Sequence, residues 1–259
     1  MEQSMKVVIL AGGRGTRISE FTEFLPKPMI PINGQPILWH IMAGYASQGY
    51  DDFIIAAGYK ADLIKRFFLE FASLSSDFEV DLRTGHVNFL EAHTPPWKVR
   101  VVDTGLETLT GGRIKRLERH LDGDTFMLTY GDGVADVDLD RLVAFHRSHG
   151  RLATMTAVRP PARFGELTLE GNRVTSFDEK PQLGGGWING GFFVFESGVL
   201  DYLAGDDQML EREPLSGLAG EGQLMAFQHH GFWQCMDTRR DHELLEALAK
   251  TGPPWVLSK

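Results

Sequence analysis

Residues 7–17 read VVILAGGRGTR, an uninterrupted apolar run that passes directly into a glycine-rich basic loop. Such a run is typical of a strand that is buried on both faces of a parallel sheet. Glycine lets backbone N–H groups approach an anion closely, while Arg14, Arg17 and the nearby Lys27 add positive charge. We therefore expect a strand followed by a loop that holds the triphosphate of a nucleotide.

Two other interpretations of this loop are weaker. The dinucleotide-binding fingerprint needs a third glycine where this chain has Ile18, and no G-x-x-x-x-G-K-[ST] motif occurs. An ordinary strand-to-helix turn with spare glycines would explain a lone Gly-x-Gly. The cations of the loop, and a second proline-flanked lysine at Lys180, favour phosphate binding instead.

The composition limits the class of protein. With 259 residues, 42% of them hydrophobic, the chain is large enough for an α/β domain with a substantial core. A net charge of −9 argues against general attraction to nucleic acid or anionic membranes. Cys235 is the only cysteine, so no intrachain disulfide can form, and we expect it to fill the core. The apolar run before Gly12 is too short for a signal peptide, and no stretch is long enough to span a membrane, so we expect a cytoplasmic protein.

Strand and helix patterns alternate through the first 160 residues. This order predicts an α/β fold: a Rossmann-like, mixed but mostly parallel sheet flanked by helices. The predicted strands cover residues 6–11, 52–57, 99–103, 125–130 and 153–158. The predicted helices cover residues 36–47, 61–71, 112–121 and 139–149. Ligands of such sheets bind beyond the carboxyl ends of the strands, where the glycine loop and Asp132 both fall.

The pattern changes after residue 160. The remaining predicted elements are hairpin strands at 165–169 and 173–177, strands at 191–195, 224–227 and 233–236, and an amphipathic helix at 238–250. No linker separates the halves, so we expect one domain over residues 1–259. Residues 5–150 would mainly bind the nucleotide, and residues 151–259, with a small β-rich portion, the second substrate. Residues 73–98 are the least regular, and we expect them to form an inserted arm or an interface.

Two carboxylates follow predicted strands directly. Asp132 comes after the strand that ends at Tyr130, and Asp237 after the strand that ends at Met236. Mg²⁺ usually takes one or two carboxylates together with phosphate oxygens and water, so this pair could hold one Mg²⁺ against a nucleotide. The alternative for each residue is a helix N-cap, a role that suits Asp237 before Thr238 well.

Three further motifs could contact ligands. Lys180 of Glu179-Lys180-Pro181 could meet a phosphate while Glu179 accepts hydrogen bonds from sugar hydroxyls, although a surface ion pair is the simpler explanation. Asn189-Gly190-Gly191 opens a predicted strand and allows close approach of a ligand, or merely a bulge. Residues 110–113, TGGR, open a helix whose free N–H groups could host the base or ribose, while Arg113 reaches a phosphate or faces solvent.

In this order, the motifs resemble those of the sugar-1-phosphate nucleotidyltransferases, over residues 5–255. The general signatures are residues 11–17 with Lys27-Pro28, Gly131-Asp132, residues 179–181 and Asp237. The branch of the family that uses CTP is suggested by residues 110–113, 129–133, 188–193, and 231–234 ahead of 236–238.

The resemblance implies an enzyme that transfers a cytidylyl group from CTP to glucose 1-phosphate with the help of Mg²⁺. The products would be CDP-glucose and pyrophosphate, and the implied setting is a homo-oligomer that serves the synthesis of surface polysaccharide such as O-antigen. The attacking phosphate is already an anion, so catalysis would need positioning and charge neutralisation and no general base.

The resemblance also implies roles for individual residues. Lys27, Arg17 and Asp132 would be catalytic, with Lys27 neutralising charge around the α-phosphorus, and Asp132 and Asp237 would bind the metal ion. The sugar phosphate would be bound by Glu179, Lys180, Asn189 and Gly190. The nucleotide would be bound by Leu10, Ala11, Gly12, Gly13, Arg14, Gly15, Thr16, Arg17, Lys27, Thr108, Gly111, Gly112, Arg113 and Gly131.

The choice of base stays open at this point. Relatives that use dTTP or UTP typically have a G-x-A-G-like stretch where this chain has residues 109–113, so we expect the base to be selected within residues 104–113. An enzyme that forms dTDP- or UDP-glucose is the main alternative. A non-catalytic sugar-nucleotide sensor with this fold is a further one, but it would be expected to lose Lys27, Asp132 or Asp237, which are all present.

Overall fold

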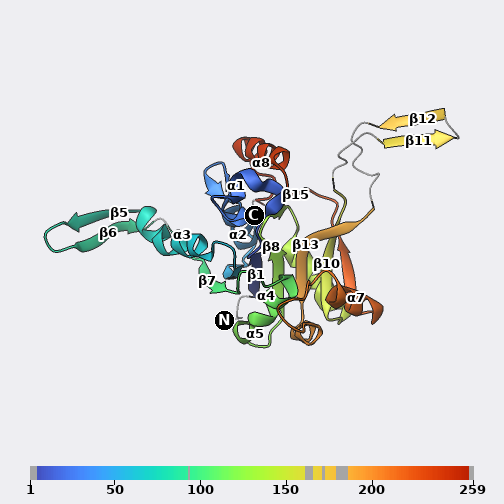
Figure 1. Cartoon of the computed structure of the whole chain (residues 1–259), viewed down its shortest axis with the longest axis horizontal. Helices are drawn as coiled ribbons and strands as arrows, with labels where there is room; N and C mark the ends of the chain where they lie inside the picture. The colour runs from blue at the N-terminus through green and yellow to red at the C-terminus, as the bar shows by residue number, and fades with distance from the viewer. Residues whose placement is uncertain (1–4, 93, 161–165, 171–172, 179–185, 257–259) are drawn as a thin grey trace.

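A seven-stranded sheet with the order β14–β10–β13–β8–β1–β4–β7 forms the centre of the molecule (Figure 1). The computed structural model describes residues 5–92, 94–160, 166–170, 173–178 and 186–256. The strands of this sheet are β1 (Lys6–Ala11), β4 (Asp52–Ala57), β7 (Lys98–Asp103), β8 (Phe126–Tyr130), β10 (Ala153–Val158), β13 (Ile188–Phe195) and β14 (Leu224–Gln228).

The sheet is mixed but mostly parallel, which confirms the predicted fold class. β1 pairs in parallel with both β4 and β8, β4 pairs in parallel with β7, and β10 pairs in parallel with β14. Only β13, among the strands of this sheet, runs against its neighbours β8 and β10. The carboxyl ends of β1, β4, β7 and β8 therefore meet at one edge.

Two cores cover the two faces, and this explains why β1 is apolar along its whole length. Val7 belongs to the core that includes α2 (Ile37–Ala46), and Val8 to the core that includes α4 (Thr110–Arg116). Both valines are fully buried. Each such side chain contributes about 1.5–3 kcal/mol by leaving water, so neither face of the strand tolerates a polar residue.

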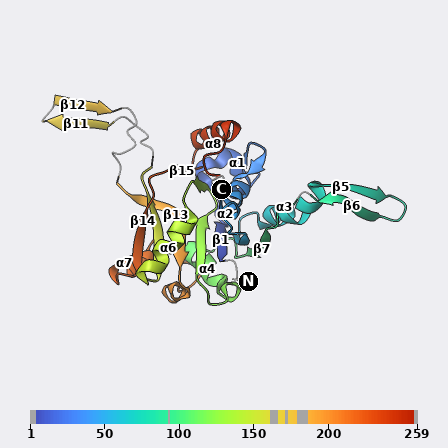
Figure 2. The ribbon, with the colours of Figure 1, turned by 180° about the vertical axis from the view of Figure 1, so that it is seen from behind.

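The other helices lie around this sheet (Figure 2). They are η1 (Thr16–Ile18), α1 (Ser19–Thr22), η2 (Lys27–Met29), α3 (Ala61–Leu74), α5 (Glu118–Leu121), α6 (Leu139–His149), η3 (Ser197–Tyr202), α7 (Glu213–Gly220) and α8 (Arg239–Thr251). The helix predicted at 112–121 is two helices, α4 and α5, which meet at Leu117. Among the described residues, no helix has both the length and the apolar character needed to cross a bilayer.

Two hairpins extend from opposite sides of the molecule (Figures 1 and 2). One consists of β5 (Ser76–Asp81) and β6 (His86–Ala92) and continues α3 outward, so residues 73–98 contain an arm as expected. The other consists of β11 (Glu166–Glu170) and β12 (Arg173–Asp178). Its Gly171-Asn172 turn lies outside the described residues.

Two smaller strand pairs complete the fold. β2 (Pro31–Ile32) pairs with β3 (Gln35–Pro36) just after η2. β9 (Gly133–Ala135) pairs antiparallel with β15 (Trp233–Cys235), so that Gly133 faces Cys235. The second pair ties the chain after β8 to the chain before α8, and it thereby brings the two strand-end aspartates to one place.

Candidate active site

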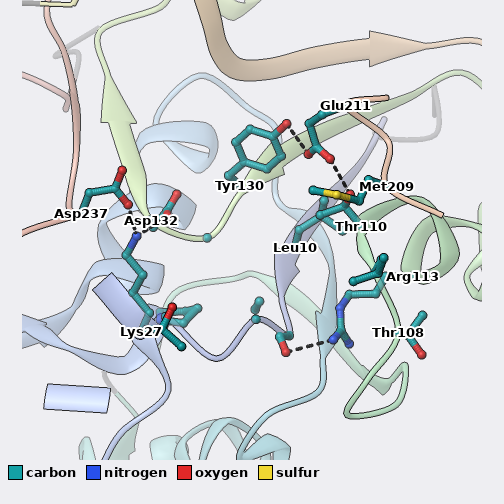
Figure 3. Close-up of a pocket in the computed structure, with 18 residues that line it drawn as sticks. Leu10, Lys27, Thr108, Thr110, Arg113, Tyr130, Asp132, Met209, Glu211 and Asp237 are labelled. Carbon is teal, nitrogen blue, oxygen red and sulfur yellow. Dashed lines mark hydrogen bonds and ion pairs between the residues drawn. The ribbon is translucent and has the colours of Figure 1, made fainter. Parts of the chain in front are cut away.

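A cavity of about 390 Å³ opens at the carboxyl ends of β1 and β8 (Figure 3). Its walls come from the loop after β1, from η2, from the chain that leads into α4, from the end of β8 and from a distant loop before α7. The lining residues are Leu10, Ala11, Gly12, Gly13, Gly15, Thr16, Lys27, Pro28, Thr108, Leu109, Thr110, Arg113, Tyr130, Gly131, Asp132, Met209, Glu211 and Asp237.

The glycine loop is packed tightly against η2. Gly15 has a φ of 63°, in the left-handed region that glycine adopts without strain. A Cβ atom at Gly15 would lie 2.9 Å from Lys27 Cβ and 2.9 Å from Thr22 Cγ2. Glycine at this position therefore lets the loop come close to the aliphatic part of the Lys27 side chain.

The ammonium group of Lys27 lies between the two strand-end carboxylates (Figure 3). Lys27 Nζ donates to Asp132 Oδ2 at 2.6 Å and to Asp237 Oδ1 at 2.7 Å. Burial lowers the pKa of Lys27, but the charges and hydrogen bonds of Asp132 and Asp237 outweigh burial and raise it above its ordinary value. Lys27 is therefore a cation at neutral pH, and it neutralises part of the charge of the two aspartates.

The alternative of helix N-caps is wrong for both aspartates. Asp132 precedes β9, a strand. The N-cap of α8 is Thr238, whose hydroxyl accepts from the backbone N–H of Asp241, while Asp241 accepts from the backbone N–H of Thr238. Thr238 is thus the cap of the helix, and the carboxylate of Asp237 accepts from Lys27 Nζ.

The donor set at Asp132 and Asp237 fits a magnesium ion that is shared with a ligand. No cluster of three or more His, Cys, Asp or Glu side chains that could hold a metal occurs within the described ranges. Two convergent carboxylates are what Mg²⁺ takes from protein when phosphate oxygens and water complete its shell. The ammonium group of Lys27 already lies between the two carboxylates, so the negative charge of Asp132 and Asp237 stabilises a cation at this position.

A second cavity, of about 220 Å³, adjoins the first and shares Tyr130, Asp132 and Asp237 with it. Asn189 and Gly190 line it, together with the ring of Trp233, whose Nε1 donates to the Gly190 carbonyl at 2.7 Å. The remaining lining residues are Thr129, Gly133, Gly191, Phe192 and Cys235. The other residues predicted to bind the sugar phosphate, Glu179 and Lys180, lie outside the described residues.

A hydrogen-bonded chain of Asn189, Tyr130, Glu211 and Thr110 connects the two cavities, and the sequence reasoning missed Glu211. Asn189 Nδ2 donates to the Tyr130 hydroxyl, which donates to Glu211 Oε1 at 2.7 Å. Thr110 Oγ1 donates to the other oxygen of Glu211 at 2.6 Å. Burial, followed by the charge of Glu211, raises the pKa of Tyr130, so its hydroxyl stays protonated. Glu211 follows no strand and belongs to no motif, so the sequence offered no signal for it.

Several predicted nucleotide-binding residues do not line the cavity. Arg14 is exposed and pairs with Glu107. The N–H groups of Gly111 and Gly112 are not free as expected, because both donate to the carbonyl of Gln208. A Cβ on either glycine would clash with residues 205–210, so these glycines serve the packing of that loop. The side chain of Arg17 lies outside the described part of the chain.

Comparison with known proteins shows which family the chain is similar to. The family described as "Nucleotidyl transferase" matches residues 6–230. The glucose-1-phosphate cytidylyltransferase of Salmonella typhi is 49% identical over 253 residues, covering 97% of this chain and 98% of that protein. A probable glucose-1-phosphate cytidylyltransferase of Bacillus subtilis is 43% identical over 92% of this chain and 93% of its own length.

Solved structures share the fold at much lower identity. HddC from Yersinia pseudotuberculosis superposes with a TM-score of 0.69 at 24% identity, covering 94% of this chain and 98% of that chain. UTP-bound UGPase from Acinetobacter baumannii superposes with a TM-score of 0.70 at 15% identity, covering 98% and 96%. At these identities the likeness concerns the fold alone.

Proposed function

Because this chain belongs to the nucleotidyl transferase family, we propose that it transfers the cytidylyl group of CTP to glucose 1-phosphate. The products are CDP-glucose and pyrophosphate. The choice of substrates is supported by 49% and 43% identity over nearly the full length of two glucose-1-phosphate cytidylyltransferases. The similarity to the Salmonella protein extends over 97% of this chain and 98% of that protein.

The observation that carries this proposal is the contact of Lys27 with Asp132 and Asp237, since both aspartates line both cavities. The larger cavity takes CTP, with its triphosphate along the loop from Gly12 to Thr16. The smaller cavity takes glucose 1-phosphate beside Asn189 and Trp233. The α-phosphorus then lies where the cavities meet, close to the ammonium group of Lys27.

Positioning and charge neutralisation explain how these residues promote the reaction. A phosphate oxygen of glucose 1-phosphate attacks the α-phosphorus of CTP in line and forms a new P–O bond to it. The bond from the α-phosphorus to the oxygen that bridges it to the β-phosphorus breaks, and pyrophosphate leaves with that oxygen. Lys27 reduces repulsion between the two anionic substrates and stabilises charge on the α-phosphate. The attacking oxygen carries no proton, so no side chain has to act as a general base.

Enzymes of this family generally use a divalent metal ion, and we assign Mg²⁺ to Asp132 and Asp237. A bound ion would supply positive charge to the phosphate oxygens of the nucleotide. The same two carboxylates hold Lys27 in place, so they also fix the direction of its ammonium group. Arg14, Arg17, Glu179 and Lys180 remain assigned by sequence alone: the first two to the polyphosphate, the other two to the sugar phosphate.

Pyrophosphate release tests the proposal directly. The purified chain is incubated with glucose 1-phosphate, Mg²⁺ and one of CTP, UTP, dTTP or ATP, and the sugar nucleotide is identified by mass. We expect CTP to give the highest kcat/KM, with Asp132→Asn as a control of strongly reduced activity. Higher kcat/KM with UTP or dTTP would replace the base assignment, and no pyrophosphate with any nucleotide would overturn the proposed function.

A further inference from the structure

The guanidinium group of Arg113 is buried against neutral oxygen atoms. Only 4% of the residue is exposed. Nη1 donates to Thr104 Oγ1 at 2.7 Å, to the Gly105 carbonyl at 2.7 Å and to the Ala57 carbonyl at 3.3 Å. Nη2 donates to the Gly12 carbonyl at 3.0 Å and to the Leu106 carbonyl at 3.4 Å. No ion pair within the described ranges involves Arg113.

These acceptors come from the ends of three neighbouring parallel strands. Gly12 follows β1, Ala57 ends β4, and residues 104–106 follow β7. One planar group from α4 therefore joins three separate loops at the edge of the sheet where the nucleotide cavity opens. Its several N–H groups in a fixed plane suit such a role better than a lysine ammonium would.

Two of these loops carry glycine where the guanidinium group needs the space. A Cβ atom at Gly12 would lie 2.2 Å from Arg113 Cζ, and one at Gly58 would lie 2.3 Å from Arg113 Nη1. At Gly13, by contrast, a Cβ atom would meet nothing within 4 Å. Gly12 is thus required by Arg113, whereas Gly13 faces open space in the cavity wall.

The direction of the Gly12–Gly13 peptide follows from these contacts. The Gly12 carbonyl accepts from Arg113 and also from the backbone N–H of Tyr59 at 3.0 Å, so it is held toward the protein interior. In a planar trans peptide the N–H points opposite to the carbonyl. Gly13 lines the cavity, and its N–H is therefore turned away from the interior and toward the cavity.

We propose that Arg113 is a positioning residue that fixes the Gly12–Gly13 peptide so that its N–H binds the polyphosphate of the nucleotide. The charge of Arg113 is used within the protein, on the carbonyl groups of three loops. This inference rests on the proposed function in that it takes the cavity to bind a nucleotide.

The experiment measures binding of inorganic tripolyphosphate by calorimetry and the KM for CTP in two variants. Arg113→Ala removes the guanidinium group, and Arg113→Lys keeps the charge but loses the planar fork. We expect both variants to weaken tripolyphosphate binding and to raise the KM for CTP by about tenfold or more, with the KM for glucose 1-phosphate within about twofold of wild type. Lys115→Ala, which changes another cation of α4, is the matched control and should bind like the wild type.

Chemical rescue separates positioning from a general loss of stability. Guanidinium ion at sub-denaturing concentration should restore tripolyphosphate binding to Arg113→Ala, whereas methylammonium, which carries the same charge, should not. Wild-type affinity in Arg113→Lys, or rescue by both cations equally, would overturn the proposal, because charge alone would then suffice.

A second variant keeps the inference testable if Arg113→Ala fails to fold. In a chain that keeps Arg113, Gly12→Ala should weaken tripolyphosphate binding, because the added Cβ would displace the guanidinium group. Full affinity in Gly12→Ala would overturn the proposal. Failure of the proposed function gives a different result: the wild type would form no CDP-glucose even if these variants changed tripolyphosphate binding as expected.

Discussion

Lys27 illustrates how one residue combines two tasks. Its ammonium group holds Asp132 and Asp237 together, with only 10% of the side chain exposed, and it faces the place where the two cavities meet. Both aspartates would otherwise repel each other in a partly buried site, where charges interact more strongly than in water. A divalent ion that binds these carboxylates has to share them with Lys27 or displace it.

Replacing Lys27 by methionine tests both tasks. We expect Lys27→Met to lower kcat/KM by about a hundredfold or more, which is about 3 kcal/mol at the transition state, because the charge on the α-phosphate loses its partner. The same variant should bind Mn²⁺ about tenfold more tightly in the absence of nucleotide, since the carboxylates are no longer neutralised. Steady-state kinetics and electron paramagnetic resonance of free Mn²⁺ measure the two effects.

The matched control is Lys65→Met, which removes the partner of Asp103 away from the cavity. It should leave kcat/KM and Mn²⁺ binding as they are in the wild type. Normal turnover of Lys27→Met would remove Lys27 from the mechanism, and unchanged Mn²⁺ affinity would show that the ion does not compete with the ammonium group.

Asp132 should be as important as Lys27, because it has both the ammonium group and the assigned metal ion as partners. We expect Asp132→Asn to lower kcat/KM by about a hundredfold or more, and chelation of divalent ions by EDTA to abolish turnover of the wild type reversibly. Restoring Mg²⁺ should return full activity to the wild type. Turnover that persists in EDTA would contradict the assignment of a metal ion to this carboxylate.

The raised pKa of the Cys235 thiol predicts how slowly it reacts near neutral pH. Burial, followed by the negative charges of Asp237 and Asp132, raises the pKa of its thiol to about 12. A raised pKa keeps the thiol protonated and unreactive at pH values well below it. At pH 8, iodoacetamide should therefore alkylate the native chain about a hundredfold or more slowly than the same chain in denaturant, as followed by mass spectrometry. Equal rates would show that the thiol is not held in this environment.

At the scale of single elements, the start of α8 supports the site. Thr238 and Asp241 form a capping box, and Asp241 also accepts from the backbone N–H of Asp237. The cap therefore fixes the chain beside a site carboxylate as well as the first turn of the helix. The sequence placed the helix correctly to within one residue, but it suggested Asp237 for the cap, since both residue types are good N-caps and only contacts distinguish them.

Removal of this cap should cost stability. Thr238→Ala should lower the free energy of unfolding by about 1 kcal/mol, because the N–H of Asp241 loses its acceptor. Urea unfolding followed by circular dichroism measures the shift of the midpoint. Thr251→Ala, at the other end of α8, removes a hydroxyl that donates to carbonyl groups of its own helix and should change little. An unchanged midpoint in Thr238→Ala would mean that the cap contributes nothing.

The elements show what a sequence pattern does and does not contain. β1, β4, α6 and β10 have the bounds predicted for them, because continuous apolar runs and the helical period mark buried strands and one-sided helices clearly. The pattern carries no direction, so the antiparallel placement of β13 could not be predicted. The break at Leu117 was missed too, since apolar residues continue the helical period across it.

At the scale of the whole molecule, the convergence of the site was predictable and its contacts were not. Asp132 and the glycine loop lie together because parallel strands end at one edge of the sheet. The ion pairs of Lys27 depend on β9 pairing with β15, a contact between residues about 100 apart that no local pattern encodes. Glu211 lacks any local signal for the same reason. The sequence suggested that Arg113 reaches a phosphate, but it could not show that the guanidinium N–H groups donate to backbone carbonyls.

The arm formed by β5 and β6 bears on the expected assembly of the whole molecule. Phe78 and Phe89 are paired across the hairpin, and each is about half exposed. Leu82 at the turn is 89% exposed. Beside the arm, a groove of about 510 Å³ is lined by aromatic residues of α2 and α3 and by Trp97. An exposed apolar arm next to an apolar groove is a common mark of an interface, so the predicted homo-oligomer remains our expectation.

Charged residues on the arm should dissolve that assembly. We expect the double variant Phe78→Glu and Phe89→Glu to have a lower molar mass than the wild type by size-exclusion chromatography with light scattering, because apolar contact between copies is replaced by repulsion of like charges. Glu79→Gln changes the neighbouring residue, whose side chain points to the other face of the hairpin, and it should leave the mass unchanged. A wild-type chain that is monomeric at micromolar concentration would contradict the expectation outright, since the arm would then be exposed in solution with no second copy against it.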